Sequence, residues 1–168
     1  GWIGVTEREI RIFGDPVLKT ECREVTDPQS VAQLVQDLLD TVNQPGRAGV
    51  AANQIGVDLK IFSYKVDDQM GYLINPEIIN TSEQVELLEE GCLSVPGLWN
   101  EVSRHQAVTI SGQQLDGSTV EIEAEGLLAQ VFQHECDHLQ GKLYIDRLTP
   151  EEKKRAMSEI RQAEWFLS

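Results

Sequence analysis

The spacing of apolar residues predicts one helix early in the chain, then a series of strands, then two further helices. Between residues 31 and 42, apolar side chains recur every three or four positions, which is the period of one helix face. These residues are Val31, Leu34, Val35, Leu38, Leu39 and Val42. Asp27 and Pro28 are residue types favoured at a helix start, and we expect the helix to run from there to Asn43.

The middle of the chain has the pattern of short strands. Segments rich in β-branched and aromatic residues are separated by turn residues, and they cover residues 60–65, 71–79, 84–88, 102–112 and 118–125. Residues 10–13 add a short extended piece that ends at the turn residues Gly14-Asp15-Pro16. Residues 44–54 are rich in glycine and other small residues, so we expect a tight loop where a backbone or ligand approaches closely.

The second helix carries polar residues on a continuation of its apolar face. One stripe holds Leu127, Val131, His134 and His138, and the neighbouring stripe holds Leu128, Phe132, Glu135 and Leu139. Gly126 precedes this helix, and Gly141 has the residue type expected just past its end. A helix of this kind runs through a core, where unpaired polar groups are costly. The last helix is expected from Thr149 towards Phe166, with a solvated face of mixed charge.

The polar stripe contains an HExxH pattern, His134-Glu135-Cys136-Asp137-His138. Because each helical residue turns the chain by about 100°, His138 projects only about 40° away from His134. Both imidazoles can therefore bind one metal ion, with Glu135 close enough to meet a water on that ion. Cys136 points about 200° away from His134 and is a poor candidate ligand.

Size and charge narrow the class of protein. The 168 residues, 40% hydrophobic and 25% charged, indicate one soluble globular domain over residues 1–168. A net charge of −14 argues against a general nucleic-acid or anionic membrane surface. No apolar run is long enough to span a bilayer, and Gly1-Trp2-Ile3-Gly4 is not a signal peptide. Three widely spaced cysteines suggest a reducing compartment rather than a disulfide framework.

The identity of a third metal ligand separates the classes of HExxH protein. One peptidase class needs a histidine where this chain has Tyr144, so that class is excluded. Another class uses a downstream glutamate, for which Glu159 or Glu164 could serve. A third possibility is Cys92, because a thiolate is a strong metal ligand.

Three motifs together resemble the peptide deformylase family, in the family's order and at similar separations. They are Gly49-Val50-Ala51-Ala52-Asn53-Gln54, Glu90-Gly91-Cys92-Leu93-Ser94 and Gln133-His134-Glu135-Cys136-Asp137-His138. Gly14-Asp15-Pro16-Val17-Leu18 also resembles the family's usual opening, so the likeness extends to about Leu148. One departure is Arg47, which stands where the family usually has a glycine, at the expected rim of the pocket.

The resemblance implies a cytoplasmic enzyme that removes the N-formyl group from formyl-methionine on new polypeptides and releases formate. It implies that Cys92, His134 and His138 bind the metal, and that water on the metal attacks the formyl carbonyl. Glu135 would act as general base and then as acid towards the leaving amine. The donors to the oxyanion would be the Gln54 side-chain amide and the Leu93 backbone N–H.

The substrate contacts follow from the same comparison and from the helix face. Leu127 and Val131 precede His134 on its own stripe and are expected to line an apolar pocket for the methionine side chain. Gly49 and Gly91 resemble family positions where the peptide backbone pairs in extended form. Glu90 would support the metal ligands from behind, with Arg104 as its partner.

The donor set and the resemblance imply different metals. Cysteine and two histidines usually suggest zinc, whereas the family implies Fe2+, with Zn2+, Ni2+ or Co2+ able to occupy the site. The expected fold is α+β, with antiparallel sheets packed around the central HExxH helix, one helix before them and one after. In some family members the last helix docks on the ribosome, which makes the ribosome a candidate partner here. A metallopeptidase and a binding module with a structural metal are the alternatives.

Overall fold

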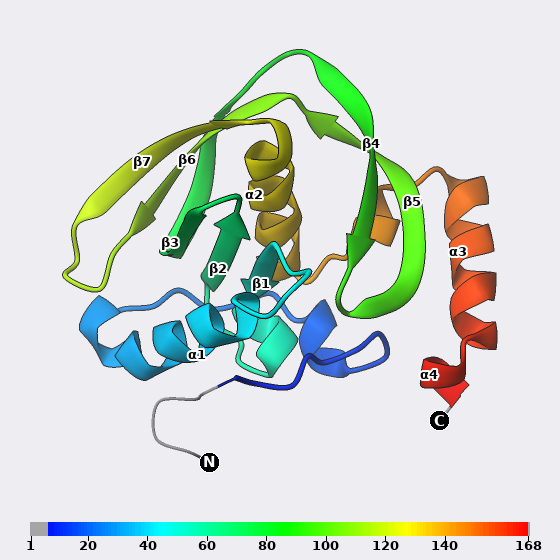
Figure 1. Cartoon of the computed structure of the whole chain (residues 1–168), viewed down its shortest axis with the longest axis horizontal. Helices are drawn as coiled ribbons and strands as arrows, with labels where there is room; N and C mark the ends of the chain where they lie inside the picture. The colour runs from blue at the N-terminus through cyan, green and yellow to red at the C-terminus, as the bar shows by residue number, and fades with distance from the viewer. Residues whose placement is uncertain (1–6, 168) are drawn as a thin grey trace.

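A helix enclosed by two antiparallel sheets forms the centre of the fold in the computed structural model, which describes residues 7–167 (Figure 1). Gly1-Trp2-Ile3-Gly4 lies outside these residues. The helices are α1 (Ala32–Val42), α2 (Gly126–Leu139), α3 (Pro150–Gln162) and α4 (Glu164–Leu167). The strands are β1 (Gly49–Ala51), β2 (Ile61–Val66), β3 (Gln69–Thr81), β4 (Val85–Cys92), β5 (Val95–His105), β6 (Ala107–Gln113) and β7 (Thr119–Glu125).

The larger sheet has the strand order β1-β2-β3-β6-β7, and β4 pairs with β5 in a separate two-stranded sheet. Successive residues of a strand face opposite sides of a sheet. Thus Phe62 and Leu73 pack in the core under α2, whereas their neighbours Ile61 and Ile74 pack in the core under α1. The two helices therefore cover opposite faces of the larger sheet, and the predicted α+β fold around the HExxH helix is confirmed.

The prediction of one strand over residues 102–112 was wrong. The chain leaves the two-stranded sheet at His105 and enters the larger sheet at Ala107. Between them, the N–H of Gln106 donates to the carbonyl of Gln84, and its own carbonyl accepts from Gly126. This crossing places β5 and α2 side by side, so that residues of both can meet.

The helix predictions needed two further corrections. The first helix begins as a 3₁₀ turn, η2 (Pro28–Val31), capped by the Asp27 side chain on the N–H of Gln29, before α1 starts. The last helix is interrupted at Ala163, whose extended backbone (ψ 138°) separates α3 from α4. No helix within residues 7–167 is long and apolar enough to cross a membrane.

The small-residue segment is more ordered than the predicted loop. Its second half forms β1, paired with β2 from Gly49↔Tyr64 to Ala51↔Phe62, and the 3₁₀ turn η3 (Ala52–Ile55). Asn53 in this turn donates to the carbonyl of His138 at 2.5 Å, which ties η3 to the end of α2. This contact positions Gln54 beside the histidines.

Candidate active site

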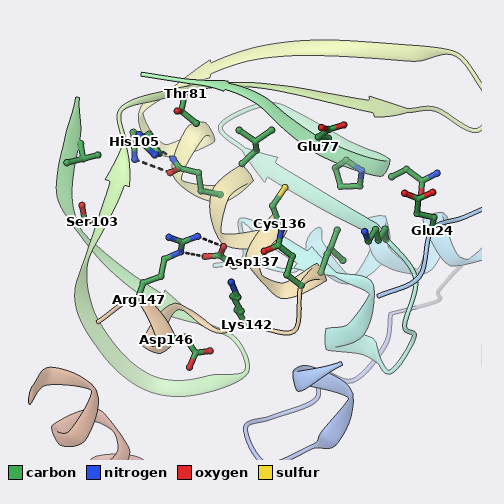
Figure 2. A pocket seen from close by; sticks show the side chains of 18 residues that line it. Glu24, Glu77, Thr81, Ser103, His105, Cys136, Asp137, Lys142, Asp146 and Arg147 are labelled. Atoms are coloured by element: carbon green, nitrogen blue, oxygen red, sulfur yellow. Dashed lines mark hydrogen bonds and ion pairs between the residues drawn. The ribbon is translucent and has the colours of Figure 1, made fainter. Parts of the chain in front are cut away.

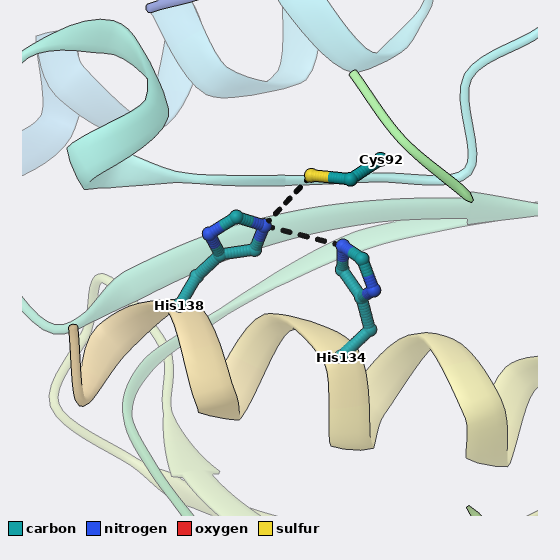
Figure 3. A group of neighbouring side chains, drawn as sticks. All are labelled: Cys92, His134 and His138. Atoms are coloured by element: carbon teal, nitrogen blue, oxygen red, sulfur yellow. Dashed lines mark hydrogen bonds between the residues drawn. The ribbon is translucent and has the colours of Figure 1, made fainter. Parts of the chain in front are cut away.

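Three potential metal ligands converge between α2 and the end of β4. The ligand atoms of Cys92, His134 and His138 all lie within 4.8 Å of one another. His138 Nε2 is 3.2 Å from Cys92 Sγ and 3.1 Å from His134 Nε2 (Figure 3). Two imidazole nitrogens and a thiol directed at one point form a donor set suited to a metal ion with an open position. The residues present therefore fit a bound metal ion, as the HExxH pattern predicted.

Local geometry explains why these side chains meet. His134 and His138 are one turn apart on α2, so they share a face. Cys92 lies at an irregularity in the β4–β5 pairing, where the register shifts between Gly91 and Cys92. Such bulges re-aim a side chain. The Ser94 N–H, 3.4 Å from Cys92 Sγ, further orients the thiol.

A buried carboxylate holds His134 from behind. Glu90 Oε2 lies 2.7 Å from His134 Nδ1, an arrangement that directs Nε2 towards the other ligands. Arg104 donates to both oxygens of Glu90, at 2.9 and 2.5 Å. Burial alone would raise the pKa of Glu90, but hydrogen bonds from Arg104 and His134 outweigh it and hold the pKa at about 2. This carboxylate therefore stays ionised.

Glu135 lies beside the histidines in a different electrostatic environment. Burial raises its pKa to about 7, and the neighbouring His134 opposes this effect only in part. Its Oε2 is 3.9 Å from His134 Nε2, and its buried Oε1 has no hydrogen-bond partner within the described residues. A carboxyl group that titrates near neutrality and has an unpaired oxygen can accept and release a proton.

Gln54 reaches the same site from η3. Its Oε1 accepts from the N–H of Ala51 at 2.9 Å, which fixes the amide so that Nε2 is the outward donor. Nε2 donates to Ser94 Oγ at 3.0 Å and lies 3.7 Å from Cys92 Sγ. The amide is thus held next to the thiol, and Ser94 is a partner that the sequence did not reveal.

A cavity of about 380 Å³ opens from these residues to the surface. The predicted contact residues Gly49, Gly91, Leu127 and Val131 all line it, together with Glu135 and Leu93. Leu127 is half exposed at the mouth, whereas Val131 is buried deeper. Arg47 also lines the rim, where its Nη1 donates to the carbonyl of Thr41 at the end of α1.

The remaining candidate ligands lie elsewhere. Cys136 lines a separate cleft of about 1070 Å³ on the other side of α2 (Figure 2). Glu159 and Glu164 are exposed on α3 and α4. Tyr144, which stands where one peptidase class has a histidine, does lie next to the site. It is buried with its ring stacked on His134 at a centroid distance of 6.4 Å, and its hydroxyl lies 3.0 Å from Asn100 Oδ1.

The site combines two histidines of an HExxH helix, a cysteine from a neighbouring sheet as the third ligand, and an adjacent carboxylate. These features define a candidate metal-dependent hydrolase. The comparisons with known proteins give the family. A family model described as "Polypeptide deformylase" matches residues 7–154. The chain is 42% identical over 167 residues to "Peptide deformylase 1" of Corynebacterium efficiens, covering 96% of this chain and 99% of that protein. It is 48% identical over 160 residues to a "Peptide deformylase" of Parafrankia sp., covering 94% and 87%.

Solved structures agree with the sequence relatives. A peptide deformylase from Thermus thermophilus superposes with a TM-score of 0.86 at 35% identity, covering 92% of this chain and 93% of that one. A peptide deformylase from Legionella pneumophila gives 0.85 at 34%, covering 93% and 94%. The chain therefore belongs to the peptide deformylase family and is a hydrolase. This family depends on a metal ion, for which the Cys92, His134 and His138 triad is the candidate site.

Proposed function

We propose that residues 1–168 form one domain that hydrolyses the N-formyl group from formyl-methionine on newly synthesised polypeptides and releases formate. The observation that carries this proposal is the convergence of Cys92, His134 and His138 next to Glu135, beside a cavity of about 380 Å³ that Cys92, His134 and Glu135 line. The triad alone could hold a structural metal. An adjacent carboxyl group with a pKa of about 7 and an open cavity are features of a site that performs hydrolysis.

Cys92, His134 and His138 are the proposed ligands, and the proposed metal in the cell is Fe2+. Zn2+, Ni2+ or Co2+ could occupy the same donor set in preparations. When bound, the ion supplies a positive charge beside the formyl oxygen and lowers the pKa of water. Glu90, held by Arg104, accepts a hydrogen bond from the Nδ1–H of His134. This bond keeps the imidazole in the tautomer that leaves Nε2 free to bind the ion.

Glu135 is the proposed general base and acid. It takes a proton from the attacking water and returns it to the nitrogen of the methionine as the C–N bond breaks. Burial raises the pKa of Glu135 above its ordinary value, and this favours return of the proton after Glu135 has accepted it. The oxyanion that develops on the formyl carbonyl is stabilised by the Gln54 Nε2–H and the Leu93 backbone N–H. Gln54 needs little reorganisation, because Ala51 already holds its amide oxygen.

The cavity lining supports an N-terminal methionine in extended form. Val131 and Leu127 offer apolar surface to its side chain, which is worth about 1.5–3 kcal/mol when fully buried. Gly49 in β1 and Gly91 in β4 offer backbone groups at the edge of the cavity, so the peptide can add as a strand. The small size of a formyl group allows Glu135 and Gln54 to close around it.

We further propose that the enzyme works in the cytoplasm on N-formylmethionyl nascent peptides, and that α3 and α4 offer a surface for docking on the ribosome. No direct sequence-specific nucleic-acid contact and no membrane contact is part of this proposal. Both helices lie at the outside of the molecule beyond the two-stranded sheet (Figure 1). Cosedimentation of the full chain and of a chain ending at Thr149 with purified ribosomes tests the docking.

The test of the activity compares three peptides with enzyme loaded anaerobically with ferrous iron. Formyl-Met-Ala-Ser should release formate, acetyl-Met-Ala-Ser should be stable, and a longer unblocked peptide should remain intact. Acetyl adds a methyl group in a confined site, and a misplacement of about 1 Å can cost roughly 10²-fold in rate. Cleavage within the longer peptide would instead assign a metallopeptidase, and inertness towards all three would favour a structural metal.

A further inference from the structure

A chain of charged side chains with alternating sign leads from His134 to solvent on the far side of α2. His134 Nδ1 contacts Glu90, which is paired with Arg104. Arg104 Nη1 also donates to Asp137 Oδ2 at 2.9 Å. Arg147 closes the chain with two hydrogen bonds to Asp137, Nε to Oδ2 at 2.6 Å and Nη2 to Oδ1 at 2.7 Å (Figure 2).

The inner three charges are buried and do not balance. The side chains of Glu90, Arg104 and Asp137 are only 4%, 1% and 6% exposed, and together they carry one negative charge. Arg147, from the 3₁₀ turn η4 (Tyr144–Arg147), supplies the missing positive charge. Its side chain is 47% exposed in the cleft behind α2. Arg147, the solvent-accessible member of these four residues, therefore neutralises the net negative charge of the three buried ones.

We propose that Arg147 is a positioning residue of the metal site, which acts through Asp137, Arg104 and Glu90 on the hydrogen bond to His134. The proposal rests on the proposed metal ligation by His134. Without Arg147, Asp137 would interact more strongly with the Arg104 guanidinium that it shares with Glu90. The negative charge of Glu90 would then be less neutralised, and Glu90 would accept a stronger hydrogen bond from the His134 Nδ1–H. The ligand field at Nε2 would change although no ligand had been replaced.

The expected size of this effect is moderate. Direct partners of metal-ligating histidines typically contribute about 10- to 100-fold in metal affinity or activity. Arg147 acts from further away and is partly screened by solvent, so we expect kcat to fall by roughly 3- to 10-fold. KM should stay within about twofold of the wild type, because Arg147 does not line the substrate cavity.

Three variants test the proposal. Arg147→Met removes the charge and keeps an apolar stem, whereas Arg147→Lys keeps the charge but loses the two-pronged contact. Lys153→Met is the matched control, because Lys153 forms an exposed ion pair with Asp146 at 2.9 Å and does not belong to the series of charges that leads to His134. Each protein is loaded with zinc and labelled with ¹⁵N at histidine. The three histidines of the sequence make the imidazole resonances simple to assign.

The decisive signal is the His134 Nδ1–H resonance. It should move downfield in Arg147→Met, return part of the way in Arg147→Lys and stay in place in Lys153→Met. The His105 signals should not change in any variant. Unchanged His134 signals and kcat in Arg147→Met would overturn the proposal, and so would a lowered thermal midpoint with unchanged His134 signals. If zinc failed to shift the Nε2 signals of His134 and His138 in the wild type, the proposed ligation itself would fail.

Discussion

Substitution of Gly49 by alanine should displace Glu135 without touching a metal ligand. A Cβ atom built at Gly49 would lie 2.6 Å from Glu135 Oε2, 2.9 Å from Cδ and 3.0 Å from Cγ. Gly49 is part of β1, a backbone conformation that alanine adopts readily, so the clash is the only cost at this position. Ordinary van der Waals contact begins at 3.4 Å, and the carboxylate must therefore move by about 0.8 Å.

This displacement sets the size of the expected effect. A shift of about 1 Å in a reacting group can cost roughly 10²-fold in rate. We expect kcat for formyl-Met-Ala-Ser to fall by about 10- to 100-fold, which corresponds to about 1.4–2.7 kcal/mol in the barrier. Metal content should equal that of the wild type, because Cys92, His134 and His138 keep their contacts.

Two further proteins isolate the cause. Gly112→Ala is the matched control, since its Cβ would lie 2.9 Å from Leu73 Cδ2 in the core, outside the cavity lining. It should lower stability and leave kcat nearly unchanged. In a Glu135→Gln background, adding Gly49→Ala should have little further effect on kcat, because both changes act through the same side chain. A normal kcat with a raised KM in Gly49→Ala would refute this reasoning and show that the methyl group obstructs the substrate.

Three other substitutions, each compared with one or more control variants, test separate parts of the site and fold. Cys92→Ala should lose most of the bound metal while Cys136→Ser and Glu159→Gln retain it, and full occupancy measured by elemental analysis in Cys92→Ala would remove Cys92 as a ligand. Gln54→Ala should keep its metal and lose about 10²–10³ in kcat, with a smaller loss in Ser94→Ala, where the donor remains. Gly141→Ala should lower the free energy of unfolding in urea by at least about 2 kcal/mol, because φ is +78° and its Cβ would lie 2.6 Å from the Lys19 carbonyl oxygen. Gly46→Ala, with φ +82°, should lose less stability, because within residues 7–167 its Cβ would meet no atom within 4 Å beyond its chain neighbours. Equal losses in the two variants would show that the Lys19 contact is unimportant.

The sequence predicted those parts of the site that follow from local geometry. The spacing of His134 and His138 places them on one helix face, and the same spacing turns Cys136 into the opposite cleft. Arg104 does donate to Glu90 in the structure, and the supporting role of this pair at the metal site stays a prediction. The roles of Gln54 and Leu93 as oxyanion donors stay predictions, and both residues line the cavity next to Cys92.

The sequence did not predict features that depend on the path of the chain between sheets. Val102, Arg104, Val108 and Ile110 are buried at even positions, so the buried face has the same parity before and after the break at Gln106. A pattern of period two does not tell which sheet a residue joins. For the same reason the link from Asp137 to Arg147 was missed, because it depends on how η4 folds back beneath α2.

The central claim is that Glu135 performs proton transfer in a site whose metal is held by other residues. The most direct measurement is formate release from formyl-Met-Ala-Ser by wild type and Glu135→Gln, with metal content determined on the same anaerobic ferrous samples. We expect equal metal content, rapid formate release by the wild type, and a loss of at least about 10²-fold in the variant. Wild-type turnover by a fully loaded Glu135→Gln enzyme would contradict the account.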